Sequence, residues 1–283
     1  MPNDFVSVVL PTYNDANNLR RAIESVFNQT HKNWELIIVD NNSQDNTEEL
    51  VKAYNSCLIK YIKVNNNGVI AVSRNVGIQA ARGGWVAFLD SDDFWSEDKL
   101  HFCLQHRDAD FIYHGVRRYR LIENKQVEVV GLLKCRDVCS DTYSNLLNYG
   151  PSPQTSSVML KKHCLKEVQG FDEHPGLSGG EDYDLWVRLA RSGCRFSFLE
   201  SVKSFYLVGG DHFTTPKRSL VLIEYLSRKY FTCFEDRPVW IHKSVIASNL
   251  KLGNYKVALC YIKKLLRKGL FFATFRVLVL FFQ

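Results

Sequence analysis

Three carboxylates lie within four consecutive residues, Asp90-Ser91-Asp92-Asp93, directly after the apolar run WVAFL at residues 85–89. An apolar run of this length is typical of a buried strand in a parallel sheet. Open α/β sheets bind ligands at the edge where such strands end, so the carboxylates would lie at that edge. Neighbouring carboxylates repel one another unless a cation lies between them. The motif therefore predicts a cation site, with Mg²⁺ or Mn²⁺ as the expected ion because both prefer carboxylate and phosphate oxygens.

Further polar clusters lie at predicted strand ends or in the loops beside them. They are Pro11-Thr12-Tyr13-Asn14, Asp40-Asn41-Asn42-Ser43 and Arg74-Asn75. Because the ends of parallel strands converge at one edge, all of these clusters are expected to form one site. A metal at Asp90 and Asp92 would neutralise a pyrophosphate leaving group, and Arg74 would add a fixed positive charge. The clusters together predict a site for a nucleotide diphosphate.

Several of these side chains also have simpler interpretations. Asp40 would accept hydrogen bonds from a base or a ribose, or it would cap the helix that follows. Arg74 would contact phosphates, or it would form an ordinary ion pair at the surface. Asp93 would assist the metal, or it would cap a helix beginning near Ser96.

A second acidic constellation is Gly179-Gly180-Glu181-Asp182, where a glycine pair precedes a helix predicted at residues 181–191. Carboxylates in the first turn of a helix commonly just complement the helix dipole. The functional interpretation is a general base, which an attacking hydroxyl group requires. In the loop after the last predicted strand, His212 would complete a metal shell or contact phosphate, or it would simply be solvated.

An alternation of strands and helices must position these residues. Strands are predicted at residues 5–10, 34–39, 59–64 and 85–89, with helices at 19–27, 47–54 and 69–81 between them. This βαβαβαβ order predicts an α/β fold with a mostly parallel sheet covered on both faces. Further strands are predicted at residues 111–113, 126–133 and 196–205, a short helix at 164–168, and only helices from residue 217 onward.

Taken together, the motifs resemble glycosyltransferase family 2, whose members have the nucleotide-sugar-binding GT-A fold with a Rossmann-like, mostly parallel central sheet. The resemblance covers about residues 5–215. It rests on Val9-Leu10-Pro11-Thr12-Tyr13-Asn14, Ile38-Val39-Asp40, Ser73-Arg74-Asn75-Val76-Gly77, Phe88-Leu89-Asp90-Ser91-Asp92-Asp93, Gly170-Phe171-Asp172 and Glu181-Asp182.

The resemblance implies a role for each matching residue. The nucleotide would be bound by Pro11, Thr12, Tyr13, Asn14, Asp40, Asn41, Arg74, Asp90 and Ser91. Asp92, with Asp90 on its ribose side, would bind the metal in the manner of a DXD motif, and His212 matches a loop that touches metal or diphosphate in some members. Asp182 would be the catalytic base of an inverting displacement, and Glu181 would contact the acceptor or shape the site.

One departure concerns the nucleotide pocket. Many members of the family carry a second acidic residue where this chain has Asn41. An asparagine side chain still hydrogen-bonds a ribose or a base, so nucleotide binding is expected to survive. The departure leaves the identity of the nucleotide open.

The basic charge of the chain is concentrated in one segment. The net charge is +6, and residues 251–283 contain seven basic and no acidic residues. Residues 270–282 are apolar apart from Thr274 and Arg276, and this run of thirteen is too short for a confident membrane span. A basic, aromatic-rich helix lying among lipid headgroups is favoured. The alternative is a helix packed on the protein or on a second subunit, as in a homodimer.

These observations predict two regions and a location. Residues 1–215 would form the GT-A catalytic domain, with the nucleotide bound by residues 1–100 and the acceptor by residues 101–215. Residues 216–283 would form a helical, basic and apolar extension that docks on an anionic membrane. The N-terminus lacks the basic region of a secretory signal, so the expected location is the cytoplasmic face of the membrane.

The predicted function is inverting, metal-dependent glycosyl transfer from a nucleotide-diphosphate sugar, preferably UDP-linked, with Mn²⁺ or Mg²⁺ as cofactor. The acceptor would be a lipid-linked glycan hydroxyl in bacterial surface polysaccharide or lipopolysaccharide synthesis, and no nucleic acid partner is expected. A sugar nucleotidyltransferase is an alternative, but it needs a glycine-rich basic loop where this chain has residues 11–14. A dehydrogenase would need a G-x-G-x-x-G motif after a strand, and a non-catalytic scaffold would not need the acidic residues.

Overall fold

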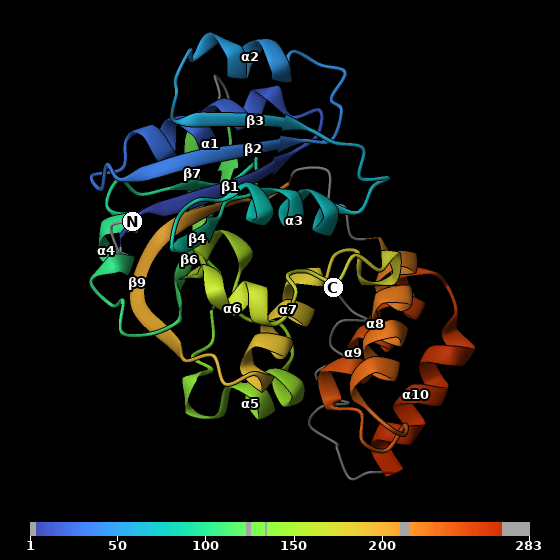
Figure 1. The fold of residues 1–283 in the computed structure, drawn as a ribbon. Helices are drawn as coiled ribbons and strands as arrows, with labels where there is room; N and C mark the ends of the chain where they lie inside the picture. Colours follow the sequence, from blue (N-terminus) through green and yellow to red (C-terminus); the bar gives the residue numbers. More distant parts are fainter. Residues whose placement is uncertain (1–3, 123–125, 134, 210–214, 268–283) are drawn as a thin grey trace.

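The computed structural model describes residues 4–122, 126–133, 135–209 and 215–267. Its strands are β1 (Val6–Thr12), β2 (Trp34–Asp40), β3 (Ile59–Lys63), β4 (Trp85–Phe88), β5 (Phe94–Trp95), β6 (Phe111–Leu121), β7 (Val127–Leu133), β8 (Met159–Lys161) and β9 (Phe196–Leu207). Within these residues they form one nine-stranded sheet in the order β3-β2-β1-β4-β8-β6-β9-β5, and β7 pairs with β6 (Figure 1).

Helices cover both faces of this sheet (Figure 1). They are α1 (Ala16–Phe27), α2 (Thr47–Ala53), α3 (Ile70–Ala80), α4 (Lys99–Leu104), α5 (Thr142–Tyr149), α6 (Lys162–Glu167), α7 (Glu181–Arg191), α8 (Pro216–Tyr230), α9 (Val239–Lys251) and α10 (Tyr255–Arg267). Short 3₁₀ turns lie at Cys139–Asp141, Thr155–Ser157 and Pro175–Leu177.

The N-terminal half of the sheet is parallel. Strands β3, β2, β1 and β4 all run in the same direction. Alternate residues of β1 face opposite layers, so Val8 packs with α1 and α2 while Val9 packs with α3. Every position of β1 and β2 is buried because both faces are covered. This arrangement brings the C-terminal ends of β1, β2 and β4 to one edge.

The C-terminal half of the sheet is mixed. Strand β8 runs antiparallel to both β4 and β6, whereas β6 and β9 are parallel. Beneath it α7 buries Trp186, whose ring lies 4.8 Å from that of Phe111, measured between centroids. Phe88 of β4 meets Phe171 at 5.3 Å in the same core. This aromatic layer fixes the first turn of α7 relative to the parallel strands.

The expected fold class is confirmed, including the strand and helix alternation in the first hundred residues and the helical C-terminal part. Helix α7 begins at Glu181, as the sequence predicts. Helix α5 and the strands β5 and β8 were not predicted. The two strands are only two and three residues long, which is too short for an alternation of apolar and polar residues to be resolved. Strand β6 extends to Leu121 because its outer half pairs with β7.

Two helix-capping alternatives are wrong. The helix expected near Ser96 begins at Lys99 and has Asp98 as its N-cap, so Asp93 does not cap it. Helix α2 has Asn46 as its N-cap, so Asp40 does not cap the helix that follows it.

The C-terminal helices pack against the sheet-bearing part. In α9, the indole N–H of Trp240 donates to the carbonyl of Leu147 over 2.8 Å, which joins α9 to α5. None of the helices in the described ranges is both long and apolar enough to cross a membrane. The apolar run at 270–282 lies outside the described residues. The division of the chain at residue 215 stays a prediction.

Candidate active site

The polar clusters that follow β1, β2 and β4 lie side by side at one edge of the sheet. Thr12 pairs with Asp40 in the β1–β2 register, and the N–H of Asn41 donates to the Thr12 carbonyl over 2.9 Å. The N–H of Leu89 donates to the Val9 carbonyl over 3.1 Å. Asp90 is the next residue, so the end of β4 lies at the same edge. Parallel pairing therefore brings these segments together, as expected from the sequence.

The loops after β1 and β2 are joined to each other by Asn14. Its side-chain oxygen accepts from the Gln44 N–H over 2.7 Å, and its own N–H donates to the Ser43 hydroxyl over 2.8 Å. Pro11 is buried beneath this junction, whereas Tyr13 has 58% of its surface exposed. An exposed aromatic ring at this edge offers a stacking surface for a base.

Asp40 is fully buried, and both of its carboxylate oxygens are hydrogen-bonded. Oδ1 accepts from the hydroxyl and the N–H of Ser43, and Oδ2 accepts from the Tyr61 hydroxyl. The side-chain oxygen of Asn41 likewise accepts from the Asn66 N–H over 2.8 Å. A direct contact between a base and Asp40 would require one of these bonds to be exchanged, and that role stays a prediction.

Arg74 of α3 links the acidic cluster to the first turn of α7. Its side chain is 4% exposed, with Nη2 2.8 Å from Asp90 Oδ1 and Nη1 2.6 Å from Glu181 Oε1. The guanidinium also lies over the ring of Phe171, 5.4 Å from its centroid. The alternative of a surface ion pair is wrong because the pair is buried. A planar guanidinium is suited to this double contact because its donors are fixed in a fork.

The carboxylates after β4 repel one another. Burial, together with the charges of Asp90 and Asp15, raises the pKa of Asp92 to about 7. Burial and the charges of Asp92 and Asp90 also raise the pKa of Asp93 well above its ordinary value, although Ser156 opposes the shift. Such mutual repulsion is the condition in which carboxylates take up a divalent cation.

A metal would fit this cluster but would need ligands from outside it. Asp93 is 1% exposed, and its Oδ2 atom has no hydrogen-bond partner within the described ranges. Over the same ranges, no three His, Cys, Asp or Glu side chains are grouped as a complete metal site. Phosphate oxygens and water are ligands that Mg²⁺ and Mn²⁺ readily accept, so the donor set is chemically suitable. His212 lies outside the described residues.

Residues that sequence analysis missed hold the acidic loop in place. The Tyr119 hydroxyl donates to the Asp92 carbonyl over 2.5 Å and accepts from Arg21 over 3.0 Å. The Ser91 hydroxyl donates to Asp15 Oδ2 over 2.8 Å. Tyr119 lies in the part of β6 that was not predicted, and no local signal connects it with a loop that precedes it along the chain.

Glu181 is tied into the loop that precedes α7. Its Oε2 atom accepts from the N–H groups of Gly179 and Gly180 over 2.8 and 3.1 Å, while Oε1 binds Arg74. Gly179 has a φ of +85°, a conformation that favours glycine. Of the two predicted roles, these contacts favour shaping the site over contacting an acceptor.

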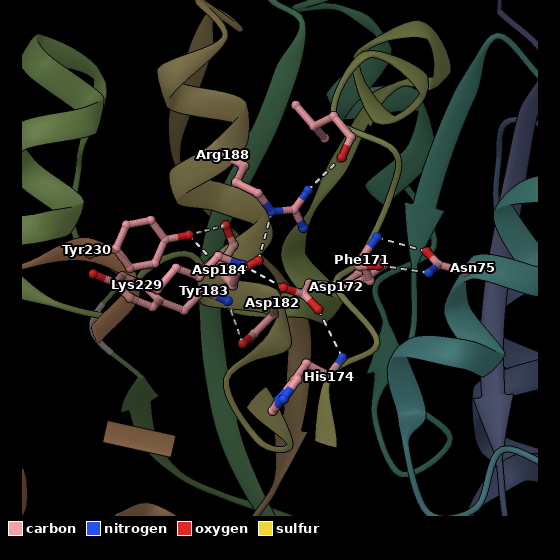
Figure 2. A network of polar contacts seen from close by, with 11 residues as sticks. Asn75, Phe171, Asp172, His174, Asp182, Tyr183, Asp184, Arg188, Lys229 and Tyr230 are labelled. Atoms are coloured by element: carbon pink, nitrogen blue, oxygen red, sulfur yellow. Dashed lines mark hydrogen bonds and ion pairs between the residues drawn. The ribbon is translucent and has the colours of Figure 1, made fainter. Parts of the chain in front are cut away.

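Asp182 follows directly and remains partly exposed. Its Oδ2 atom accepts from the Thr155 hydroxyl over 3.0 Å. Its Oδ1 atom accepts from the Tyr183 N–H over 2.7 Å (Figure 2). Burial and the neighbouring charge of Glu181 raise the pKa of Asp182 to about 6, against the effect of Arg74. A carboxylate that only complemented the helix dipole would have a lowered pKa, so this environment favours a proton-transfer role.

The chain matches known family models over most of its length. The model of glycosyl transferase family 2 matches residues 7–138, and the model described as the N-terminal domain of galactosyltransferase matches residues 150–209. These matches favour glycosyl transfer over the nucleotidyl transfer and dehydrogenase chemistry considered above.

Two curated relatives are similar over most of their own length. The putative teichuronic acid biosynthesis glycosyltransferase TuaG of Bacillus subtilis is 31% identical over 212 residues, covering 73% of this chain and 80% of that protein. The UDP-Glc:α-D-GlcNAc-diphosphoundecaprenol β-1,3-glucosyltransferase WfgD of Escherichia coli is 33% identical over 192 residues, covering 68% and 72%.

The fold is also similar to that of a solved glycosyltransferase. The mannosyltransferase PcManGT of Pyrobaculum calidifontis, in complex with GDP-Man and Mn²⁺, superposes with a TM-score of 0.59 at 17% identity. The match covers 97% of this chain and 80% of that protein. At this identity the similarity establishes the fold.

Proposed function

The chain belongs to glycosyl transferase family 2, and we propose that it moves a sugar from a nucleotide-diphosphate donor to a hydroxyl of a lipid-linked glycan. A UDP-linked donor is favoured because the similar protein WfgD is named for UDP-Glc. That name also specifies an acceptor on diphosphoundecaprenol, and TuaG is assigned to teichuronic acid synthesis. Both support bacterial surface polysaccharide assembly as the process.

The observation that carries this proposal is the double ion pair of Arg74. One guanidinium contacts Asp90, in the cluster suited to a diphosphate, and Glu181, the residue before Asp182. A donor site and a general base must lie in the same space for direct displacement. The contacts of Arg74 with Asp90 and Glu181 support such an arrangement, because they hold the predicted donor site next to the predicted base.

In the proposed mechanism, Asp182 takes the proton of the acceptor hydroxyl. The hydroxyl oxygen then bonds to the anomeric carbon while the bond from that carbon to the diphosphate oxygen breaks, and the nucleoside diphosphate leaves with the electron pair. Attack opposite the leaving group inverts the anomeric configuration. A carboxylate with a pKa of about 6 is ionised at pH 7 and is a stronger base than an ordinary aspartate.

The leaving group requires compensation of its charge. A bound Mn²⁺ or Mg²⁺ would supply electrostatic stabilisation of the departing diphosphate. Asp92 and Asp90 would hold that ion, with Asp93 behind them, and His212 stays a prediction in this role. The nucleotide would lie against Tyr13 and the loops that Asn14 joins.

We further propose that the protein docks on the cytoplasmic face of an anionic membrane. Helix α10 exposes large apolar side chains, namely Tyr255, Val257, Leu259 and Leu266. The same helix carries exposed Lys263 and Lys264 and no acidic residue. Apolar and basic side chains on one helix suit a headgroup region, and a lipid-linked acceptor would be presented there. A homodimer that covers α10 is the alternative occupant of this surface.

The decisive experiment is a screen of nucleotide sugars for hydrolysis and transfer, followed by the Asp182→Asn variant. A functional site is expected to release free sugar slowly from one donor without acceptor, which a non-catalytic scaffold would not do. Asp182→Asn should retain donor binding and lose transfer by several orders of magnitude. Transfer at a near wild-type rate in this variant would remove the base assignment.

A further inference from the structure

Two residues after Asp182, helix α7 carries a second carboxylate that is fully buried, Asp184. Its Oδ1 atom lies 2.7 Å from Lys229 Nζ and accepts from the Tyr230 hydroxyl over 2.6 Å. Its Oδ2 atom accepts from Arg188 Nε, one turn further along α7, over 2.8 Å. Lys229 and Tyr230 belong to α8, so these contacts join α8 to the helix whose first turn carries Asp182 (Figure 2).

Lys229 also reaches a second carboxylate. Its Nζ atom lies 2.6 Å from Asp172 Oδ2. Asp172 follows Phe171, whose N–H and carbonyl are both bonded by the Asn75 side chain, at 2.8 and 2.9 Å. Phe171 is the ring that underlies the guanidinium of Arg74. The end of α8 is therefore connected to both parts of the site, α7 and α3 (Figure 2).

Packing leaves no space between α8 and the loop before α7. A Cβ atom added at Gly180 would lie 2.7 Å from a methyl carbon of Leu222 in α8. A Cβ atom at Gly176 would lie 3.0 Å from the ring of Tyr225, and the His174 ring stacks on that ring at 4.3 Å. Glycines at these positions let α8 approach the loop closely, so the helix limits movement of the segment that leads to Asp182.

Helix α8 supplies part of the charge and hydrogen bonding that compensates the buried carboxylate of Asp184. An ionised carboxylate inside a protein requires charged and hydrogen-bonded partners, and it disturbs its surroundings when one is removed. Of the partners of Asp184, Lys229 and Tyr230 come from α8, and Arg188 alone comes from α7. The position of the first turn of α7 thus depends on contacts made by the C-terminal helices.

We propose that Lys229 and Tyr230 are positioning residues, which hold Asp184 and thereby keep the carboxylate of Asp182 in its orientation for proton transfer. The C-terminal helices would then be part of the catalytic unit as well as a docking extension. This inference rests on the proposed role of Asp182 as the general base. Neither residue has to touch donor or acceptor for this effect.

The test uses Lys229→Met and Tyr230→Phe in the full chain, with Arg228→Met as the matched control. Arg228 is the neighbouring residue of α8, has 78% of its side chain exposed and pairs with Glu224 at the surface. Lys229→Met should lower kcat on the order of tenfold or more, and Tyr230→Phe several-fold, because small displacements of a catalytic group are costly. The KM for the donor and the affinity for UDP should change less than about twofold, because the proposed role of Lys229 and Tyr230 does not involve contact with the donor.

Two further measurements separate positioning from a general loss of structure. In Lys229→Met, the acid limb of the kcat–pH profile should move to lower pH, because a displaced Asp182 would be better solvated. Lys229→Arg should restore part of kcat by returning the charge. Wild-type kcat in folded Lys229→Met and Tyr230→Phe would overturn the inference, as would parallel losses of kcat, UDP affinity and Tm with an unmoved pH profile.

The outcomes also distinguish this inference from the proposed function. If Asp182→Asn keeps transfer, the base assignment fails and the positioning role fails with it. If Asp182→Asn abolishes transfer while the two α8 variants behave like Arg228→Met, only the positioning role fails.

Discussion

Arg74 Nη1 lies 2.6 Å from Glu181 Oε1, a buried contact between residues that are 107 positions apart in the chain. The second arm of the same guanidinium holds Asp90 at 2.8 Å. The side chain of Arg74 thus connects the carboxylates after β4 to the residue before Asp182. This connection makes the site one unit, and it can be tested directly.

Removing the guanidinium should disrupt both stability and donor binding. In Arg74→Met, Asp90 and buried Glu181 lose their shared cation, and the expected loss is about 3–5 kcal/mol in the free energy of unfolding. Arg74→Lys keeps the charge but cannot span both carboxylates, so an intermediate loss is expected. Urea denaturation and UDP titration measure both effects.

Arg120→Met serves as the control for Arg74, because Arg120 forms an exposed pair with Glu128. This surface pair should contribute little, so the control should unfold at the same urea concentration as wild type. The interpretation of Arg74 as a buried bridge fails if Arg74→Met is as stable as Arg120→Met.

Asp182 should destabilise the fold at neutral pH. Its pKa is raised from 3.8 to about 6, so the native state holds the proton more tightly than the unfolded chain. The ionised side chain therefore costs stability above pH 6, and this cost fades as pH falls from about 6 to 4. The free energy of unfolding of Asp182→Asn is expected to exceed that of wild type by about 1–2 kcal/mol at pH 7.5, after allowance for partial exposure. Near pH 4 the two free energies should be nearly equal.

Denaturation at a series of pH values measures this dependence, and Asp110→Asn provides a control of opposite sign. A hydrogen bond from Arg195 is the main cause that lowers the pKa of Asp110, so its ionised form stabilises the fold. Asp110→Asn should therefore lose stability at pH 7.5. A gain in Asp182→Asn that is equal at pH 4 and pH 7.5 would contradict the raised pKa.

The acidic loop should control metal-dependent nucleotide binding. Asp92→Ala is expected to remove the Mn²⁺-dependent part of UDP binding, because the proposed ligand is lost. Tyr119→Phe removes the hydroxyl that donates to the Asp92 carbonyl. It should weaken that binding roughly tenfold, because this hydrogen bond orients the residue proposed to hold the metal. Calorimetry with Mn²⁺ and with EDTA separates the metal-dependent part.

Tyr255→Phe is the matched control for Tyr119, since Tyr255 is exposed on α10. It should bind UDP and Mn²⁺ as wild type does. Unchanged affinity in Asp92→Ala would remove the metal role from that residue.

Membrane docking should depend on the C-terminal segment. Two variants test this: a deletion of residues 269–283, and a replacement of Lys263 and Lys264 with Gln. Each should sediment less with anionic vesicles than wild type does, and each should bind neutral vesicles only weakly. The remaining binding should fall further as salt is raised, because exposed charges are screened. Undiminished vesicle binding in both the deletion variant and the Lys263/Lys264 variant would defeat the membrane proposal, and a monomer–dimer shift would favour a second subunit instead.

Local sequence patterns were sufficient to predict much of the sheet edge at which the polar clusters meet. The alternation of β1, α1 and β2 follows from apolar spacing, and the polar clusters lie where those strands end. The start of α7 at Glu181 follows from the preceding glycines and the periodicity of the helix. These features depend on residues a few positions apart, which is the range over which hydrophobic periodicity and turn chemistry act.

Other features of the site had no local signal. The two-residue strand β5 exists only because it pairs with β9, and this pairing carries Asp93 into the interior rather than to a helix cap. The partners of Asp40, among them Tyr61 of β3, follow from how neighbouring strands and their loops close over it.

The sequence by itself determined the kind of protein: the α/β alternation, the family and the acidic residues available at the edge of the sheet. Only the tertiary structure decided how those residues are used, because buried charges acquire their partners through packing between distant segments. Arg74 became a bridge between Asp90 and Glu181 instead of a surface cation. Lys229 became a partner of Asp184 for the same reason, since a fully buried carboxylate must find its compensating charges in whichever helix packs against it.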